Sequence, residues 1–256
     1  MASNAGLDWR EISGTGPGGK IMKSDVTLAA SAPASPETGI QGARRVPLSP
    51  MRKVIATRMV ESLFSAPHYY MSADGDMTEA IKFREQPLGF KPSFNDIILH
   101  AVVRAIRQHP LMNARWAEDA IEENDDINLG VAVALPAGLV VPVLRRAQDM
   151  SLEGIHHTVK AMADKARAGK LTPDDYSGST FTVTNLGVFG VDQFTAIINQ
   201  PNSAILAVGR IAKKPVVIDD GIHIRSIATL TISSDHRVID GAVAAQFMAT
   251  LRTLLE

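Results

Sequence analysis

Residues 27–43, TLAASAPASPETGIQGA, divide the chain into parts that must fold separately. This segment is rich in Ala, Ser and Pro and has no apolar periodicity, so it cannot bury enough apolar surface to become ordered. We therefore predict a semi-stiff, disordered linker here. Residues 1–26 and residues 44–256 are then the two regions that can fold.

The region from residue 44 onward mixes helical and strand patterns without strict alternation. Serine N-cap signals predict helix starts at Ser49, Ser93 and Ser151, and Pro110 marks the end of one helix. The pattern favours a mixed α/β sandwich over a doubly wound sheet. Predicted helices cover residues 48–64, 77–86, 93–108, 151–171 and the last stretch from about Val238; predicted strands cover 68–77, two runs around a Pro-Ala-Gly turn within 128–144, and 179–185, 204–209, 215–219 and 223–234.

Composition excludes several classes of function. The net charge of −1 gives no reason to expect nucleic acid or a membrane surface as a partner. The chain has no cysteine, which excludes disulfides, thiolate zinc sites and a cysteine nucleophile. No apolar run reaches the length of a membrane span. We predict a soluble, cytoplasmic protein without a metal.

A cluster of charged residues lies where the strand IATLTI ends and the last apolar helix begins. The sequence SSDHRVIDGA, residues 233–242, contains His236 between Asp235 and Arg237, with Asp240 four residues later. Imidazole is the side chain whose ordinary pKa lies near neutral pH, which suits a catalytic base. A purely structural charged turn, with Arg237 paired to an acid, explains the same residues.

A second candidate lies at the end of the strand FTVTN. Thr182 and Thr184 share one face of this strand, and Asn185, Gly187 and Gly190 then interrupt it. A hydroxyl at such a strand end can point into a cleft. Threonine also simply favours strands, and the spacing alone does not decide between the two interpretations.

Other motifs carry weaker signals. The glycine-rich run at 14–20, GTGPGGK, lacks the spacing and the preceding strand of a phosphate-binding loop. The tripeptide DKA at 164–166 resembles the site of lipoyl attachment in lipoyl domains, but it lies inside a helical pattern, so Lys165 is interpreted as an ordinary surface lysine. His156 and His157 are adjacent on one helix and make a poor metal pair.

The stretches FTVTNLG and DHRVIDG together resemble the signature of the dihydrolipoamide acyltransferase catalytic domain. This family forms the core of 2-oxo acid dehydrogenase complexes and is related in fold to chloramphenicol acetyltransferase. The resemblance covers residues 44–256, and His236 follows Thr184 by 52 residues, the family's spacing. Supporting stretches, in the family's order, are RKVIATRM, PHYY, FNDIILHAVVRAI, GLVVPVL and INQPNSAILAVG.

Residues 6–26, GLDWREISGTGPGGKIMKSDV, resemble the second half of a peripheral subunit-binding domain, the module that docks the other enzymes of the complex. The resemblance places the first helix of that module before Met1. It therefore predicts a partial module over residues 1–26, the linker over 27–43, and an acyltransferase domain over 44–256. The lipoyl group would be carried on a domain absent from this chain.

The resemblance implies transfer of an acyl group between dihydrolipoamide and coenzyme A, with both thiols supplied by the substrates. It assigns His236 as the general base and Thr184, a family variant of serine, as the donor to the oxyanion. Asp240 matches a position that is Asp or Asn in the family and either orients the site or is structural. The coenzyme A contacts are not assigned.

The family also implies a mixed-sheet, two-layer sandwich that forms homotrimers with the active site between subunits. His236 and Asp240 would come from one chain and Thr184 from its neighbour. Larger cores are 24-mers or 60-mers, and we favour the 24-mer. Expected partners are a lipoyl domain and the decarboxylating and dihydrolipoamide dehydrogenase components; the mitochondrial matrix is an alternative location to the cytoplasm.

Two other functions stay open at this point. One is an O-acetyltransferase for a free small molecule of the chloramphenicol type, against which the linker and the docking module argue. The other is a scaffold without catalysis, against which the presence of His236, Thr184 and Asp240 argues. Among acyl groups we favour acetyl, as in pyruvate complexes, over succinyl, branched-chain and acetoin-derived groups.

Overall fold

The computed structural model describes residues 12–31, 44–135 and 138–256. The chain divides into two compact units, Met1–Leu48 and Ser49–Glu256. Each unit is described by itself.

In the N-terminal unit, one carboxylate organises the glycine-rich loop. Asp25 lies in the first turn of helix α1 (Lys23–Ser31), which follows the 3-10 turn η3 (Pro17–Gly19). Its carboxylate accepts hydrogen bonds from Thr15 N at 2.9 Å, Thr15 Oγ1 at 2.7 Å and Met22 N at 2.8 Å. These hydrogen bonds lower the pKa of Asp25, and the bond from the Thr15 backbone amide has the largest effect.

Helix α1 also corrects the predicted linker boundary. The helix continues through Ser31, so residues 27–31 are helical rather than disordered. An acidic first turn and the run of Leu, Ala and Ser residues are compatible with helix. The rest of the predicted linker, residues 32–43, lies outside the described residues.

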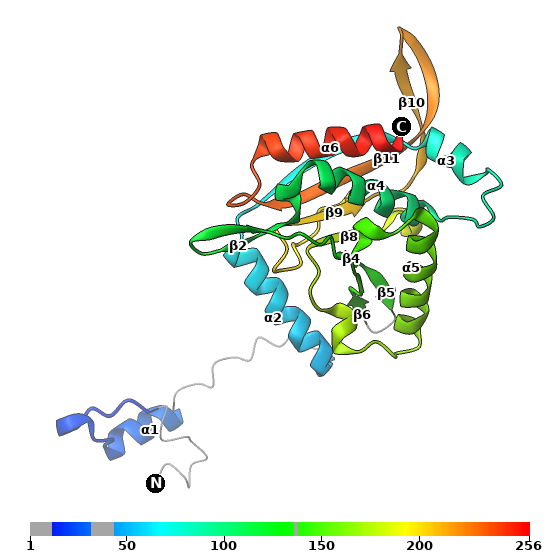
Figure 1. Cartoon of the computed structure of the whole chain (residues 1–256). Helices are drawn as coiled ribbons and strands as arrows, with labels where there is room; N and C mark the ends of the chain where they lie inside the picture. The colour runs from blue at the N-terminus through cyan, green and yellow to red at the C-terminus, as the bar shows by residue number, and fades with distance from the viewer. Residues whose placement is uncertain (1–11, 32–43, 136–137) are drawn as a thin grey trace. The chain divides into compact units, whose positions relative to one another are not determined.

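A mixed sheet forms one layer of the second unit (Figure 1). Within the described residues it has seven strands, in the order β1-β11-β9-β8-β4-β7, with β10 paired to β11. Strands β4, β8 and β9 are parallel to one another, and the other pairs are antiparallel. The strands are β1 (His68–Asp76), β4 (Leu129–Val131), β7 (Val143–Leu144), β8 (Phe181–Asn185), β9 (Ala204–Val208), β10 (Ala212–Ile218) and β11 (Gly221–Asp235).

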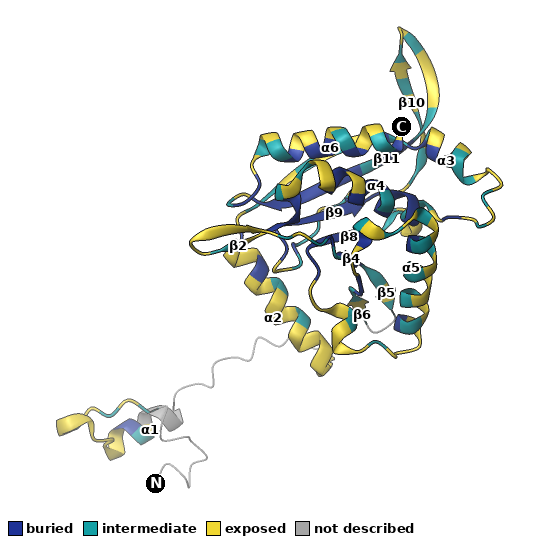
Figure 2. Ribbon diagram, viewed as in Figure 1, coloured by how far each residue is buried: buried dark blue, intermediate teal, exposed yellow. Residues whose placement is uncertain are grey.

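Helices cover one face of this sheet and enclose the core; buried residues are dark blue on the ribbon in Figure 2. Phe181 and Val183 of β8 and Leu230 and Ile232 of β11 point into it, as the period of two along a strand requires. The helices of this unit that contribute to the core are α3 (Thr78–Arg84), α4 (Phe94–Gln108), α5 (Leu152–Arg167) and α6 (Gly241–Leu255). The predicted two-layer, mixed-sheet sandwich is confirmed.

Helix starts agree with the cap signals in the sequence. Ser49 accepts a hydrogen bond from Arg52 N at the start of α2 (Pro50–Ser65). Ser93 forms a reciprocal capping box with Asp96 at the start of α4, and Ser151 caps α5 through Gly154 N. In each case the hydroxyl satisfies an amide that has no partner inside the helix.

Two regions contain strands that differ from the sequence-based prediction. The run 114–123 was not predicted to form strands, but β2 (Ala114–Ala117) and β3 (Ala120–Glu123) form a separate hairpin. The region 128–144 forms β4, β5 (Val133–Leu135), β6 (Gly138–Val140) and β7 rather than two strand runs. Pro136 and Ala137 of the predicted turn lie outside the described residues.

Lys165 of the DKA tripeptide lies on α5, as predicted, and ties the end of that helix to the following loop. Its Nζ donates to both carboxylate oxygens of Asp175, at 2.9 and 2.6 Å. Asp175 also accepts from the backbone and the hydroxyl of Thr172. The Lys165 hydrogen bond is the largest cause that lowers the pKa of Asp175 to about 2.

This contact predicts a pH-dependent contribution to stability. The pKa of Asp175 in the folded protein lies below its ordinary value, so the stabilisation is present above pH 4 and is lost as the pH falls towards 2. Asp175→Asn should therefore lower the denaturant midpoint at pH 6, and its difference from the unmodified chain should shrink between pH 4 and 2. Asp174→Asn is the control, because the hydrogen bond that Asp174 accepts from Arg145 goes to its backbone oxygen and not to its carboxylate. A difference that is constant with pH contradicts the prediction.

Candidate active site at the end of β11

Backbone hydrogen bonds fix the turn that carries His236. At the end of β11, Asp235 N donates to Ser203 O at 2.8 Å and His236 N donates to Pro67 O at 3.0 Å. Val238 and Ile239 are buried, and their amides both donate to Asp235 O. The strand end is therefore held on both sides and beneath, while the side chain of His236 is exposed to solvent.

Asp235 and Arg237 pair with each other on either side of His236. Arg237 donates from Nε to Oδ1 at 3.0 Å and from a terminal nitrogen to Oδ2 at 2.7 Å, and its backbone amide also reaches Oδ1. Asp235 is buried, and its hydrogen bond is the largest cause that raises the pKa of Arg237. The guanidinium lies over the Trp116 ring, 4.9 Å from its centroid. Both residues stabilise the turn, as expected.

Tyr69, which was not among the candidate residues predicted from the sequence, contacts the imidazole of His236. The two ring centroids are 4.6 Å apart, and the planes are inclined by 50°. Tyr69 lies on β1, opposite Ser234 of β11, so the contact follows from strand pairing between residues far apart in sequence. The only signal in the sequence was the aromatic pair in PHYY.

Asp240 is the N-cap of α6. Its Oδ1 accepts a hydrogen bond from Val243 N at 2.9 Å, and its backbone oxygen accepts one from Tyr69 Oη at 2.8 Å. The helix begins at Gly241, three residues later than predicted, because residues 236–240 form the turn. The carboxylate therefore has a structural task at the helix start.

Thr184 lies on the sheet face opposite the core helices α3 to α6, since Phe181 and Val183 of the same strand point into the core. Its neighbour on that face, Thr182, accepts hydrogen bonds from Asn202 and Asn199. Within the described chain, the Thr184 hydroxyl has no such partner, although the residue is 7% exposed. It is thus the hydroxyl on this strand that is left to bond with something else.

A tight turn follows Thr184 and presents apolar side chains. A Cβ at Gly187 would lie 2.7 Å from Gly209 O, so only glycine fits there. Gly190 closes the turn with φ of +81°, a conformation that favours glycine. Between them, Val188 and Phe189 are 81% and 66% exposed. Two apolar side chains are therefore exposed to solvent on the turn that follows Thr184.

Sheet geometry separates His236 from Thr184 in one chain. Thr184 lies beside Ala207 of β9, and Ala207 lies beside Thr231 of β11. His236 is five residues beyond Thr231. Two strand spacings across and five residues along amount to roughly 20 Å. The two side chains of one chain therefore cannot act on the same carbonyl group.

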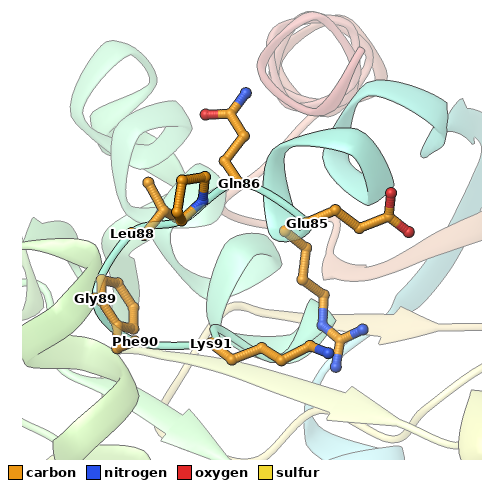
Figure 3. Close-up of a pocket in the computed structure, with 8 residues that line it drawn as sticks. Glu85, Gln86, Leu88, Gly89, Phe90 and Lys91 are labelled. Carbon is orange, nitrogen blue, oxygen red and sulfur yellow. The ribbon is translucent and has the colours of Figure 1, made fainter.

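Two hollows on the described surface of this unit contain none of the candidate residues. One is lined by Arg84, the last residue of α3, and by residues 85–91 of the loop that follows it (Figure 3). The other is polar and includes Arg115, Asn128, Ser179 and Asn202. In the described part of the chain, no three His, Asp or Glu side chains form a group that could hold a metal ion. No described helix is long and apolar enough to cross a membrane.

Comparison with solved structures first defines the class of fold. A chloramphenicol acetyltransferase aligns with a TM-score of 0.50 over 75% of this chain and 89% of its own, at 13% identity, which shows a shared fold alone. Much more similar are a dihydrolipoamide acetyltransferase of Azotobacter vinelandii and the cubic core of a pyruvate dehydrogenase multienzyme complex. Both have a TM-score of 0.82 and cover 87% of this chain and 96% of theirs, at 31% and 32% identity.

Sequence comparison then identifies the family. Residues 40–256 match the catalytic domain of the 2-oxoacid dehydrogenase acyltransferases, and this chain belongs to that family. Residues 1–27 match a domain described as an E3-binding domain.

Curated relatives are dihydrolipoyllysine-residue acetyltransferase components. One from the pyruvate dehydrogenase complex of Rickettsia typhi is 38% identical over the whole of this chain and 65% of its own length. One from the acetoin cleaving system of Bacillus subtilis is also 38% identical, over the whole of this chain and 67% of its own. The chain thus spans about two thirds of the length of these relatives.

The cap position of Asp240 predicts how substitutions there affect stability. Asp240→Asn should keep the free energy of unfolding nearly unchanged, because asparagine caps helices equally well, whereas Asp240→Ala should lower it by about 1 kcal/mol. Urea denaturation followed by circular dichroism measures both. Equal loss in the Asn and Ala variants would show that the charge matters more than the cap.

Proposed function

We propose that this chain is the core acyltransferase of a 2-oxo acid dehydrogenase complex, where it moves an acyl group between the dihydrolipoamide of a lipoyl domain and coenzyme A. The observation that carries the proposal is the rigid turn at the end of β11, which presents an exposed His236 in a chain of this family. Both quoted curated relatives are acetyltransferases, so acetyl is the favoured group and pyruvate the favoured parent acid.

Residue spacing supports the assignment of the site. In the Azotobacter enzyme, a serine, a histidine and an asparagine were studied for roles in the catalytic mechanism; the histidine follows the serine by 52 positions and precedes the asparagine by four. Thr184, His236 and Asp240 have the same two spacings here. Threonine keeps the hydroxyl of serine, and aspartate keeps the capping oxygen of asparagine.

The chemistry assigned to these residues begins with a thiol. A thiol of ordinary pKa about 8.5 is mostly protonated near neutral pH, and a neutral imidazole of His236 can accept its proton. The resulting thiolate of one substrate attacks the thioester carbonyl of the other, and the carbonyl oxygen becomes negatively charged. Collapse of this intermediate expels the second thiolate, which takes the proton back from His236.

Thr184 would stabilise the oxyanion by donating its hydroxyl hydrogen. Unlike the hydroxyl of Thr182, the Thr184 hydroxyl has no hydrogen-bond partner in the described chain. It can therefore donate to the oxyanion without first breaking another hydrogen bond. A donor of this kind stabilises the charged intermediate more than the planar carbonyl. Asp240 would position α6 and the turn rather than transfer a proton.

The separation of roughly 20 Å along the sheet supports a site shared between subunits. We place His236 and Asp240 of one chain against Thr184 of a neighbour in a homotrimer. Apolar side chains left exposed in this chain favour such assembly. They lie on α2 (Val54, Val60, Leu63, Phe64), beside Thr184 (Val188, Phe189) and on the β10–β11 hairpin that projects from the sheet in Figure 1 (Val217, Ile222, Ile224).

Larger assembly and partners follow from the family. The likeness to a cubic core supports a 24-mer rather than a 60-mer. The match of residues 1–27 supports docking of a dihydrolipoamide dehydrogenase, with residues 1–26 as part of a docking module, 32–43 within the linker and 44–256 as the catalytic domain. Coenzyme A is the acyl acceptor, the acyl group reaches it from the lipoyl group of a lipoyl domain, and the location is the cytoplasm or the mitochondrial matrix.

Loss of the base should abolish transfer. With acetyl-CoA and dihydrolipoamide, His236→Ala should lower kcat/KM by about a hundredfold or more, the effect expected when a general base is removed. Acetyl-CoA should exceed succinyl- and isobutyryl-CoA as substrate. Near-normal activity of the variant, or faster acetylation of chloramphenicol than of dihydrolipoamide, would contradict the proposal.

Mixed trimers test whether the site is shared. Chains with His236→Ala and chains with Thr184→Val are each expected to be nearly inactive alone, while Thr184→Ser keeps much of the activity. After random co-assembly, about three quarters of trimers contain both chains, and one interface in three then pairs intact His236 with intact Thr184, so roughly one quarter of sites recover. No recovery in verified mixed trimers would place both residues in one chain or show that one of them is not needed.

A further inference from the structure

The His236 side chain needs an orienting contact if it is to act as a base. Its backbone is fixed by the bond to Pro67 O, but an exposed imidazole can still rotate about two side-chain bonds. In the described chain, no hydrogen bond to either ring nitrogen is present; the neighbouring Asp235 is occupied by Arg237. Orientation must therefore come from packing.

In the described chain, the ring of Tyr69 packs against the imidazole ring of His236. The centroid distance of 4.6 Å and the inclination of 50° lie within the range of favourable aromatic pairs. Such a contact covers one side of the imidazole. The residue as a whole stays exposed to solvent.

Three features make Tyr69 itself rigid. It lies inside strand β1, paired in register with Ser234 of β11. Its ring packs against the hydrophobic core. Its hydroxyl donates to the backbone oxygen of Asp240 at 2.8 Å, and burial raises the pKa of the phenol, which keeps this proton in place.

These contacts join the two ends of the turn through one side chain. The ring touches His236 at the start of the turn, and the hydroxyl holds Asp240 at its end, where α6 begins. Contacts of Tyr69 with both ends of the turn are not needed to end strand β11, because the backbone hydrogen bonds of Asp235 and His236 already hold the strand end.

We propose that Tyr69 is a positioning residue that fixes the imidazole of His236 through its ring, with its hydroxyl in a secondary role at Asp240. The proposal rests on the proposed function of His236. The ring limits the rotation of the imidazole and thereby keeps it aligned with the thiol. A base that is misplaced by about 1 Å can cost on the order of a hundredfold in rate.

Two substitutions separate the ring from the hydroxyl. In the assembled enzyme, Tyr69→Leu should lower kcat by about tenfold to a hundredfold, while KM for acetyl-CoA changes by less than about threefold. Tyr69→Phe should restore kcat to within about threefold of the unmodified enzyme, because the ring remains. Tyr176→Leu is the matched control, since Tyr176 also donates to a backbone oxygen, that of Leu171, from a partly exposed position.

A second measurement does not depend on turnover. Diethyl pyrocarbonate modifies exposed imidazoles, and mass spectrometry of the peptide that contains His236 gives the rate at this residue. Removing the ring should raise this rate several-fold in Tyr69→Leu and leave it unchanged in Tyr69→Phe and Tyr176→Leu. Activities are expressed per amount of assembled protein, as measured by size-exclusion chromatography. If Tyr69→Leu does not assemble, Tyr69→Met takes its place.

The outcomes distinguish this proposal from the one it rests on. If His236→Ala is inactive but Tyr69→Leu and Tyr69→Met keep full kcat, Tyr69 has no positioning role while His236 remains the base. Equal losses in the Phe and Leu variants would also overturn the proposal, because the hydroxyl rather than the ring would then matter. If His236→Ala is fully active, the assignment of the base itself is wrong.

Discussion

The pairing of β11 with both β1 and β9 is the constraint on which the candidate site depends. It brings Pro67 and Ser203, 136 positions apart in sequence, to either side of one strand end, where their carbonyl oxygens hold His236 and Asp235. The Asp235–Arg237 pair then stabilises the turn with a buried carboxylate that is fully used. In the proposed mechanism, the fixed backbone of the turn reduces the reorganisation that proton transfer at His236 would require.

The same sheet places the candidate residues Thr184 and His236 at opposite ends. Strands β8 and β9 are parallel, and β11 runs against β9, so the end of β8 that carries Thr184 lies away from the end of β11 that carries His236. In the proposed homotrimer, these two ends are two half sites of complementary chemistry. Association of subunits in a closed ring can complete each half site with the other, and the exposed apolar side chains beside Thr184 would become buried in the process.

Local rules predicted most of the helices and strands. Serine caps at Ser49, Ser93 and Ser151 marked helix starts correctly because each satisfies nearby backbone amides, a short-range interaction. The start of α6 was predicted too early, since Asp240 caps it only after a turn held by β1 and β9. The hairpin β2–β3 was missed because its short strands pair with each other outside the main sheet and carry no extended apolar alternation.

The sequence by itself determined the fold class and the family and predicted His236, Thr184 and Asp240 as site residues, because the spacing of motifs and the periodicity of apolar residues lie along the chain. Only the tertiary structure decided which of these residues are close. Strand order places Tyr69 against His236 and places Thr184 roughly 20 Å away, and strand order depends on long-range pairing between segments that no local pattern specifies.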